Sequence, residues 1–270
     1  MKLKKKAFFI LVLFLLLIGV AYFAVPKKTF ADTGKEIQLL YAKTISKNGH
    51  IYACGYVQTK STNPWDTVVL HYQVGNGEWK DVNANYIGRN DGTYGLWYFE
   101  MDGSPDPMSG YSKISVDFKF AIKITKNSGE TFWDNNNGQD YKVSGGYSAT
   151  YDRCVLGASN LVLTSAHSWV NDKAYFSGDI TLKNLAYVKD VKVRYSYDNW
   201  ASFKEVPAYY NYTQGNGLEI WSFRAEGPAD TNNFQFALSY TVNGQTYWDN
   251  NFQSNYTVNV GEYLSSPGLR

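Results

Sequence analysis

The chain of 270 residues is short of the residue types on which most catalytic and metal sites depend. Its three histidines, His50, His71 and His167, show no spacing typical of metal ligands. No Gly-x-Ser-x-Gly elbow and no phosphate-binding glycine loop occurs. Glycoside hydrolysis needs two carboxylates side by side, and no acidic pair is duplicated as an active site would be. The sequence predicts a protein that is not an enzyme and holds no cofactor or metal.

Acidic residues are missing from the first 31 positions, where lysines and apolar residues dominate. Several lysines precede an unbroken apolar run from Ala7 to Val25, and a small-x-small site ends at Ala31. This order predicts an export signal over residues 1–31 with cleavage after Ala31. The alternative is a retained membrane anchor, because about 20 apolar residues suffice to cross a bilayer. Both interpretations place the remaining chain outside the cytoplasm, secreted or held at the outer face of the membrane.

Positive charge is also scarce once the N-terminal segment is set aside. Residues 1–31 hold six lysines and no acid, so the remainder has 20 basic and 24 acidic side chains and a formal charge of −4. A nucleic-acid-binding surface needs a basic stripe to offset the phosphate charge, and none remains. The sequence therefore predicts no nucleic-acid partner, and contact with a membrane only through the N-terminal segment.

Only two cysteines occur, Cys54 in the first half and Cys154 at the start of the second. An exported protein can form a disulfide. A bridge here would join the two halves to each other and would not close either one. Two unpaired buried thiols are the alternative, and the sequence does not choose between them.

Helical periodicity is absent after residue 32, and alternation of apolar and polar residues takes its place. Alternation of this length is typical of half-buried β-strands. Gly-containing turns at Asn127–Gly129 and Asn243–Gly244 predict hairpins. The alternating segments are Val68–Val74, Val116–Ile124, Val191–Tyr195 and Phe234–Val242.

One short sequence occurs twice, as Thr131–Asn136 and as Thr246–Asn251, near the end of each half. A spacing of 115 residues between Trp133 and Trp248 indicates a duplicated domain, because solenoid units are much shorter. A Ser/Gly junction at Ser144–Ser148 separates the halves. The chain is therefore predicted to be all-β, with two tandem immunoglobulin-like antiparallel β-sandwiches over residues 36–145 and 152–262. Further aligned pairs are Ile51–Val57 with Ala174–Ile180, Lys80–Val82 with Lys204–Val206, and Leu96–Phe99 with Ile220–Phe223.

The second half resembles carbohydrate-binding module family 21, the starch- and glycogen-binding domains of fungal glucoamylases and of glycogen-targeting phosphatase subunits. The segments that carry the resemblance occur in family order over nearly the whole half. They are Leu182–Lys189, Val193–Tyr195, Asp198–Trp200, Val206–Tyr210, Phe236–Leu238 and Tyr247–Asn251. The first half resembles the family less closely, since it keeps Trp133–Gly138 but has Asn63–Trp65 in place of the Asn-Leu-Ala-Tyr segment.

The resemblance implies two sugar sites on the second half. One is expected at Trp200 and Trp248 with the amides of Asn250 and Asn255, and the other at Tyr187 and Tyr210. An aromatic face stacks on the axial hydrogens of a glucose ring, and amides bind its hydroxyl groups. The asparagines have a second interpretation, as turn formers that bond their own backbone.

Candidate contacts in the first half are Trp133, Asn135, Trp65 and Tyr86. Other aromatic residues fall in phase with buried strand positions and are expected in the core: Tyr72, Trp97, Tyr195, Trp221 and Tyr240. An Asp/Asn-rich run at Asp134–Asp140 is similar to a calcium loop, but its glycine is misplaced for an EF-hand, so no metal ligands are predicted.

These observations predict an exported, non-catalytic protein that binds α-1,4-glucan, that is, starch, glycogen or maltooligosaccharide. Two weak sites in one chain raise avidity when both reach the same polymer. Three alternatives stay open: a phosphatase-type glycogen-targeting scaffold, an accessory subunit of a secreted amylolytic enzyme, and a surface interaction protein that no longer binds sugar.

Overall fold

The computed structural model describes residues 34–47, 50–103, 116–145 and 152–264. Every regular element in this part of the chain is a β-strand, which confirms the predicted all-β class. Within the same ranges, no helix has the length and apolar character needed to span a bilayer. The expected export signal or anchor over residues 1–31 lies outside the described residues, as does the junction from Gly146 onward.

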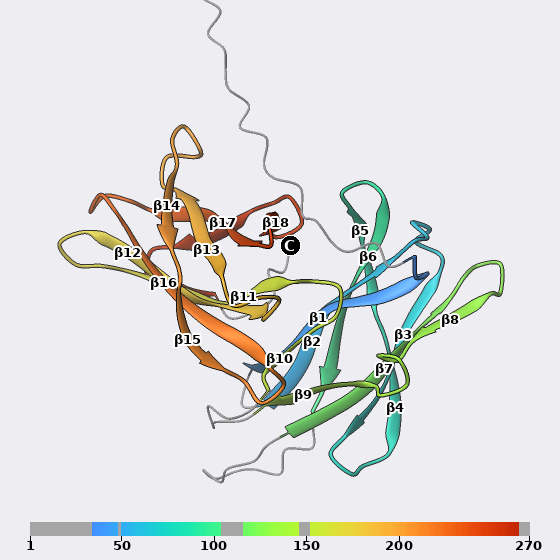
Figure 1. Cartoon of the computed structure of the whole chain (residues 1–270). Helices are drawn as coiled ribbons and strands as arrows, with labels where there is room; N and C mark the ends of the chain where they lie inside the picture. The colour runs from blue at the N-terminus through green and yellow to red at the C-terminus, as the bar shows by residue number, and fades with distance from the viewer. Residues whose placement is uncertain (1–33, 48–49, 104–115, 146–151, 265–270) are drawn as a thin grey trace, which may run out of the picture.

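The first sandwich consists of two antiparallel sheets, which are drawn from blue to green in Figure 1. One sheet has the order β10-β1-β2-β6-β5, and the other has the order β4-β3-β7-β8, with β9 also paired to β7. The strands are β1 (Ile37–Lys47), β2 (His50–Thr59), β3 (Thr67–Val74), β4 (Trp79–Asn83), β5 (Asn85–Asn90), β6 (Tyr94–Asp102), β7 (Val116–Thr125), β8 (Thr131–Asp134), β9 (Tyr141–Gly145) and β10 (Cys154–Leu156).

The second sandwich repeats this topology strand for strand, and it is drawn from yellow to red in Figure 1. Its sheets have the orders β15-β16-β12-β11-β20 and β14-β13-β17-β18, with β19 also paired to β17. The strands are β11 (Leu161–Val170), β12 (Ala174–Lys183), β13 (Lys189–Ser196), β14 (Lys204–Pro207), β15 (Tyr209–Thr213), β16 (Leu218–Gly227), β17 (Asn233–Val242), β18 (Gln245–Asp249), β19 (Tyr256–Asn259) and β20 (Tyr263–Leu264).

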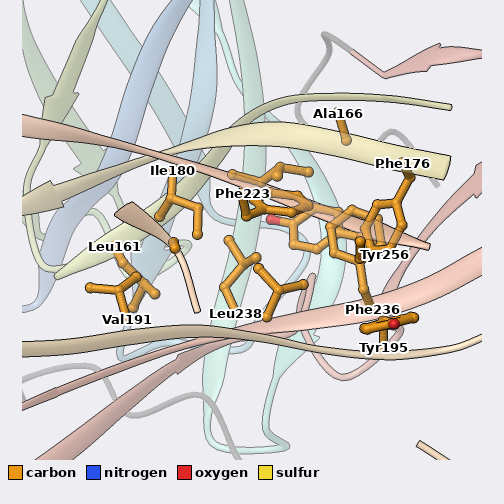
Figure 2. Packing of buried hydrophobic residues seen from close by; sticks show 14 of the residues in the cluster. Leu161, Ala166, Phe176, Ile180, Val191, Tyr195, Phe223, Phe236, Leu238 and Tyr256 are labelled. Carbon is orange, nitrogen blue, oxygen red and sulfur yellow. The ribbon is translucent and has the colours of Figure 1, made fainter. Parts of the chain in front are cut away.

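The alternating segments of the sequence form the central strands and supply each core. The apolar positions of β7, from Val116 to Ile124, are buried, and so are those of β17, from Phe234 to Val242. Aromatic rings dominate the second core, where Phe176 stacks on Phe234 at 4.6 Å between ring centroids. Figure 2 shows the same core, with Phe236, Tyr195 and Phe223 gathered between the sheets. Burial of one face of each strand explains the period of two.

The duplicated Trp-Asp-Asn-Asn segment has a structural role in both sandwiches. Asp249 is fully buried, and its Oδ2 accepts hydrogen bonds from the Leu163 amide at 3.1 Å and from the Tyr256 hydroxyl at 2.8 Å. Asp134 accepts the equivalent bonds from the Leu39 amide and from Tyr141. Strands β1 and β11 shift register at these points. The repeated aspartate therefore satisfies a backbone donor at a β-bulge.

The two sandwiches contact each other through the outer face of the β1-β2-β6 sheet. An apolar cluster joins Leu40, Tyr41 and Tyr56 of the first sandwich to Val162 and Phe252 of the second. The Phe252 ring lies 4.7 Å from the Tyr56 ring. These contacts make the outer surface of the first sheet an internal surface of the molecule.

Strand β10 lies in the segment that the sequence assigns to the second domain, yet it completes the first sheet. It pairs with β1, where Lys43 has Cys154 opposite it on one side and Cys54 opposite it on the other. Two cysteines on either side of a central strand are about 10 Å apart, too far for a disulfide. Both thiols are free and buried, so the unpaired alternative holds. Burial raises the pKa of each thiol to about 12.

Candidate functional site

Trp248 lies on the outer face of the β14-β13-β17-β18 sheet, where a cation separates it from a second aromatic ring. The Arg194 guanidinium lies 4.9 Å from the Trp248 ring and 4.7 Å from the Phe203 ring. Glu205 holds this cation with bonds of 2.7 and 2.8 Å. A guanidinium between two rings is favourable and fixes both ring planes. The result is a rigid, half-buried aromatic face at the surface of the second sandwich.

Trp200 lies in the β13–β14 hairpin, and hydrogen bonds define the shape of this turn. Its amide donates to Ser196 Oγ at 2.8 Å, while the amide and hydroxyl of Ser202 donate to the Asp198 carboxylate. The bond from the Ser202 hydroxyl first, then those from the Ser202 amide and the Ser196 hydroxyl, lower the pKa of Asp198 to about 2. Asn199 and Trp200 adopt φ values of 55° and 64°, which non-glycine residues seldom adopt. The side-chain bonds of the turn offset this strain.

Strand β17 brings the two tryptophans to one sheet. A hydrogen bond of 3.4 Å from Gln235 Nε2 to Asn199 Oδ1 attaches the Trp200 hairpin to this strand. Trp248 pairs with Ser239 of the same strand. The Trp200 hairpin and Trp248 are thus both attached to strand β17, at Gln235 and Ser239.

The predicted amide contacts need correction, because the loop after Trp248 uses its asparagines internally. Asn250 is 0 % exposed, and its Oδ1 accepts the Gln253 amide at 3.0 Å. The Asn255 amide donates to the Asn250 carbonyl at 2.8 Å, and its half-buried side chain leaves a buried Oδ1 with no hydrogen-bond partner among the described residues. Phe252, in the same loop, packs against the first sandwich. In this structure Asn250 orders the loop and offers no surface amide.

The second predicted site, at Tyr187 and Tyr210, lies at another edge of the sandwich. Tyr187 is 97 % exposed in the loop before β13. Tyr210 is exposed on edge strand β15, with its ring 6.2 Å from Trp221 and nearly perpendicular to it. Trp221 is half-buried against the core, and its Nε1 donates to Glu219. Nothing described here brings Tyr187 and Tyr210 into contact with each other.

The four candidates of the first sandwich fall at different places. Trp133 is 53 % exposed on β8, whereas Asn135 accepts the Gly138 amide and so forms its loop. Trp65 is 79 % exposed in the turn before β3. Tyr86 packs on the core, edge-on to Trp97 at 5.1 Å, and its hydroxyl donates to the Thr62 carbonyl. Tyr86 is therefore largely a structural residue, the counterpart of Tyr210 in strand register.

Arg194 and Phe203 were not predicted from the sequence, although one signal pointed to them. Arg194 occupies an outward position of β13, and Phe203, just before β14, is two residues from outward Glu205, so alternation puts both on the face of Trp248. The assembled face offers two ring surfaces and a fixed cation, which are groups suited to binding a ligand. Within the described ranges, no group of three His, Cys, Asp or Glu side chains is arranged to hold a metal ion.

Comparison with known proteins finds a family match within the second sandwich. Residues 156–259 match the family described as carbohydrate/starch-binding module (family 21). Protein phosphatase 1 regulatory subunit 3B of Mus musculus is 36% identical over 104 residues, which cover 37% of this chain and 36% of that protein. Protein phosphatase 1 regulatory subunit 3C of Xenopus tropicalis is 33% identical over 87 residues, covering 32% and 39%. The chain thus spans little more than a third of the length of these curated relatives.

One solved structure that the chain matches is the starch binding domain of Rhizopus oryzae glucoamylase in complex with beta-cyclodextrin and maltoheptaose. The identity is 30%, the match covers 37% of this chain and 92% of that one, and the TM-score is 0.30. Another is the carbohydrate binding module of the muscle glycogen-targeting subunit of Protein Phosphatase-1, at 26% identity, 38% and 77% coverage and a TM-score of 0.32. The match to the family lies in the second sandwich, where residues 156–259 are similar to the family 21 carbohydrate/starch-binding module.

Proposed function

We propose that the second sandwich binds α-1,4-glucan, with Trp200 and Trp248 as the stacking residues. The observation that carries this proposal is the aromatic face of Trp248, Arg194 and Phe203, next to the Trp200 hairpin, within the segment that matches the family. A glucose ring stacks its axial hydrogens on an aromatic face. The Arg194 guanidinium has N–H donors of the kind that sugar hydroxyls need.

The geometry changes which residues carry the proposal. Trp248 stays in it, and Phe203 and Arg194 join it, because the Arg194 cation lies against both rings. Trp200 stays as well, because it lies in the same hairpin as Phe203. Asn250 leaves it, since its side chain is inside the loop. Asn255 stays as a second contact, because its side chain is half-buried and not fully enclosed like that of Asn250. Exposed Tyr187 and Tyr210 stay as a separate predicted site.

The role in the cell has two candidate forms. One is an exported glucan-binding protein, either free or accessory to a secreted amylolytic enzyme. This form requires the export signal that is expected in residues 1–31. The other is a glycogen-targeting subunit of a phosphatase, and the names of the curated relatives favour it. Co-purification with the phosphatase catalytic subunit from cell extract supports the second form, and recovery of the processed chain from the medium supports the first.

Affinity electrophoresis tests the binding proposal directly. The full chain is run through gels that contain amylopectin, glycogen or soluble hydroxyethyl cellulose, beside Trp200→Ala and Trp248→Ala. We expect retardation by amylopectin and glycogen only, weakened in both variants. Trp169→Ala is the matched control, because Trp169 is half-buried on the opposite sheet. Retardation by cellulose alone, or equal retardation of all variants in glycogen, contradicts the proposal.

A further inference from the structure

The first sandwich, which lies outside the family match, carries two exposed tryptophans on one sheet face. Trp79 on β4 is 39 % exposed, and Trp133 on β8 is 53 % exposed. Trp79 pairs with Gln73 of β3, and Trp133 pairs with Lys123 of β7. Val82 of β4 and Phe132 of β8 pack against the core, and the two tryptophans fall at the alternate positions, so both rings stand on the outer face of the β4-β3-β7-β8 sheet.

His71 lies between the two rings and fixes their relation. Its ring stacks on Trp79 with 4.7 Å between centroids and 8° between planes. It also meets Trp133 edge-on, at 6.5 Å and 88°. Asp81 Oδ1 lies 2.6 Å from His71 Nδ1, which holds the imidazole in this orientation. The two tryptophans are therefore parts of one ordered cluster and are not isolated surface residues.

The same arrangement occurs on the second sandwich with other residues. His71 pairs with Ala121 of β7, and Arg194 pairs with Ala237 of β17, so the two residues occupy equivalent positions. Asp81 corresponds to Glu205 as the carboxylate opposite the central residue. By the same register, Trp79 corresponds to Phe203 and Trp133 to Trp248. A planar group between two rings, held by a carboxylate, is thus present twice.

Two lysines border the rings of the first sandwich. Lys119 Nζ lies 5.4 Å from the Trp79 ring and 3.2 Å from the Asp140 carboxylate. Lys123 Nζ lies 5.5 Å from the Trp133 ring. Ammonium groups beside aromatic rings are donors for hydroxyl oxygens at the rim of a stacking surface. Opposite charges at Asp81 and Asp140 keep the face close to neutral.

A cavity of about 780 Å³ continues this face toward the second sandwich. Gln73 and Lys119, which adjoin Trp79, also line the cavity, together with Asn76, Gln139 and Asn216. Ligand pockets commonly enclose about 300–1,000 Å³. Gln73 and Asn216 already donate to the Gly77 and Cys154 carbonyls. The exposed amides of Asn76 and Gln139 are the wall groups that suit a ligand rich in hydroxyl groups, because an amide both donates and accepts hydrogen bonds.

We propose that this face is a further binding site, for a neutral hexopyranose oligosaccharide. Trp79 and Trp133 stack on sugar rings, and the amide-lined cavity takes the next sugars of the chain. The ligand class rests on the proposed function, whereas the position of the site depends only on the geometry of the first sandwich. Each stacked ring contributes roughly a fivefold gain in affinity, as expected for about 1 kcal/mol.

Fluorine NMR on the full chain labelled with 5-fluorotryptophan tests the proposal. The chain has eight tryptophans, and single Trp→Phe variants assign their resonances. Maltoheptaose is the probe. We expect the Trp79 and Trp133 resonances to shift saturably as maltoheptaose is added. In Trp79→Ala, the Trp133 shift should require a roughly fivefold higher maltoheptaose concentration to reach half of its final value. Trp97, which is buried, and Trp169, on the opposite sheet of the other sandwich, are internal controls that stay unchanged.

The outcomes separate this inference from the proposed function. Shifts only at Trp200 and Trp248 overturn the inference and leave the proposed function intact. Shifts only at Trp79 and Trp133 support the inference and remove the second sandwich as the glucan site. No shift at any tryptophan overturns both. Equal shifts at Trp169 indicate non-specific association and also overturn the inference.

Discussion

Replacing Asp249 with alanine removes the acceptor that joins the repeated Trp-Asp-Asn-Asn segment to strand β11. The Leu163 amide and the Tyr256 hydroxyl both donate to its Oδ2, and both groups are buried. Burial raises the pKa of Tyr256, so its hydroxyl stays protonated and remains a donor. A buried donor without an acceptor costs about 1–3 kcal/mol. Two buried donors left without an acceptor therefore lower the free energy of unfolding of the second sandwich by about 2–6 kcal/mol.

Urea unfolding of the full chain measures the loss, and hydrogen exchange locates it. We expect the peptide that contains Leu163 to lose protection in Asp249→Ala, while the peptide that contains Leu39 keeps it. Asp134→Ala reverses this pattern, because Asp134 holds the Leu39 amide in the first sandwich.

Asp190→Ala is the matched control for this change. Asp190 is exposed and pairs with Lys192 at 2.6 Å on the surface. Exposed pairs of this kind contribute little, so the free energy of unfolding changes by no more than about 0.5 kcal/mol. If Asp249→Ala unfolds at the same urea concentration as Asp190→Ala, the structural role assigned to the repeated aspartate is wrong.

Three further outcomes follow from the geometry. The thiols of Cys54 and Cys154 are buried, and burial raises the pKa of each to about 12. Ellman's reagent at pH 8 should therefore label neither cysteine in the native chain and both in urea. Labelling of the native chain contradicts the burial. Phe252→Ala removes the ring that packs on Tyr56 between the two sandwiches. We expect the two sandwiches to unfold at more widely separated temperatures in calorimetry, and an unchanged thermogram contradicts this prediction. Hydrogen bonds lower the pKa of Asp198 to about 2. The stability advantage of wild type over Asp198→Asn is therefore complete above the pKa of the unfolded chain, about 4, and disappears as the pH falls through about 2. A difference in free energy of unfolding between the two proteins that stays constant from pH 7 to pH 2 contradicts this prediction.

The sequence alone determined the strands and the duplication, because both depend on local pattern. Alternation with a period of two places one face of β7 and β17 in the cores, and the burial of Phe118, Phe120 and Phe236 confirms it. The Asn243–Gly244 turn takes φ values of 52° and 77°, which Asn-Gly adopts readily in hairpins. Such features are set by neighbouring residues and need no knowledge of the fold.

The tertiary structure decided which side chains meet. Trp79 and His71 contact each other because β4 pairs with β3, and Trp133 reaches His71 because β7 brings β8 to the other side. Loop conformation turned Asn250 inward, since the Gln253 amide needs an acceptor within the loop. The packing of two sandwiches placed Phe252 against Tyr56. A period of two assigns each residue to a face, whereas strand order and domain packing decide what lies opposite that face, and they depend on contacts far apart in the chain.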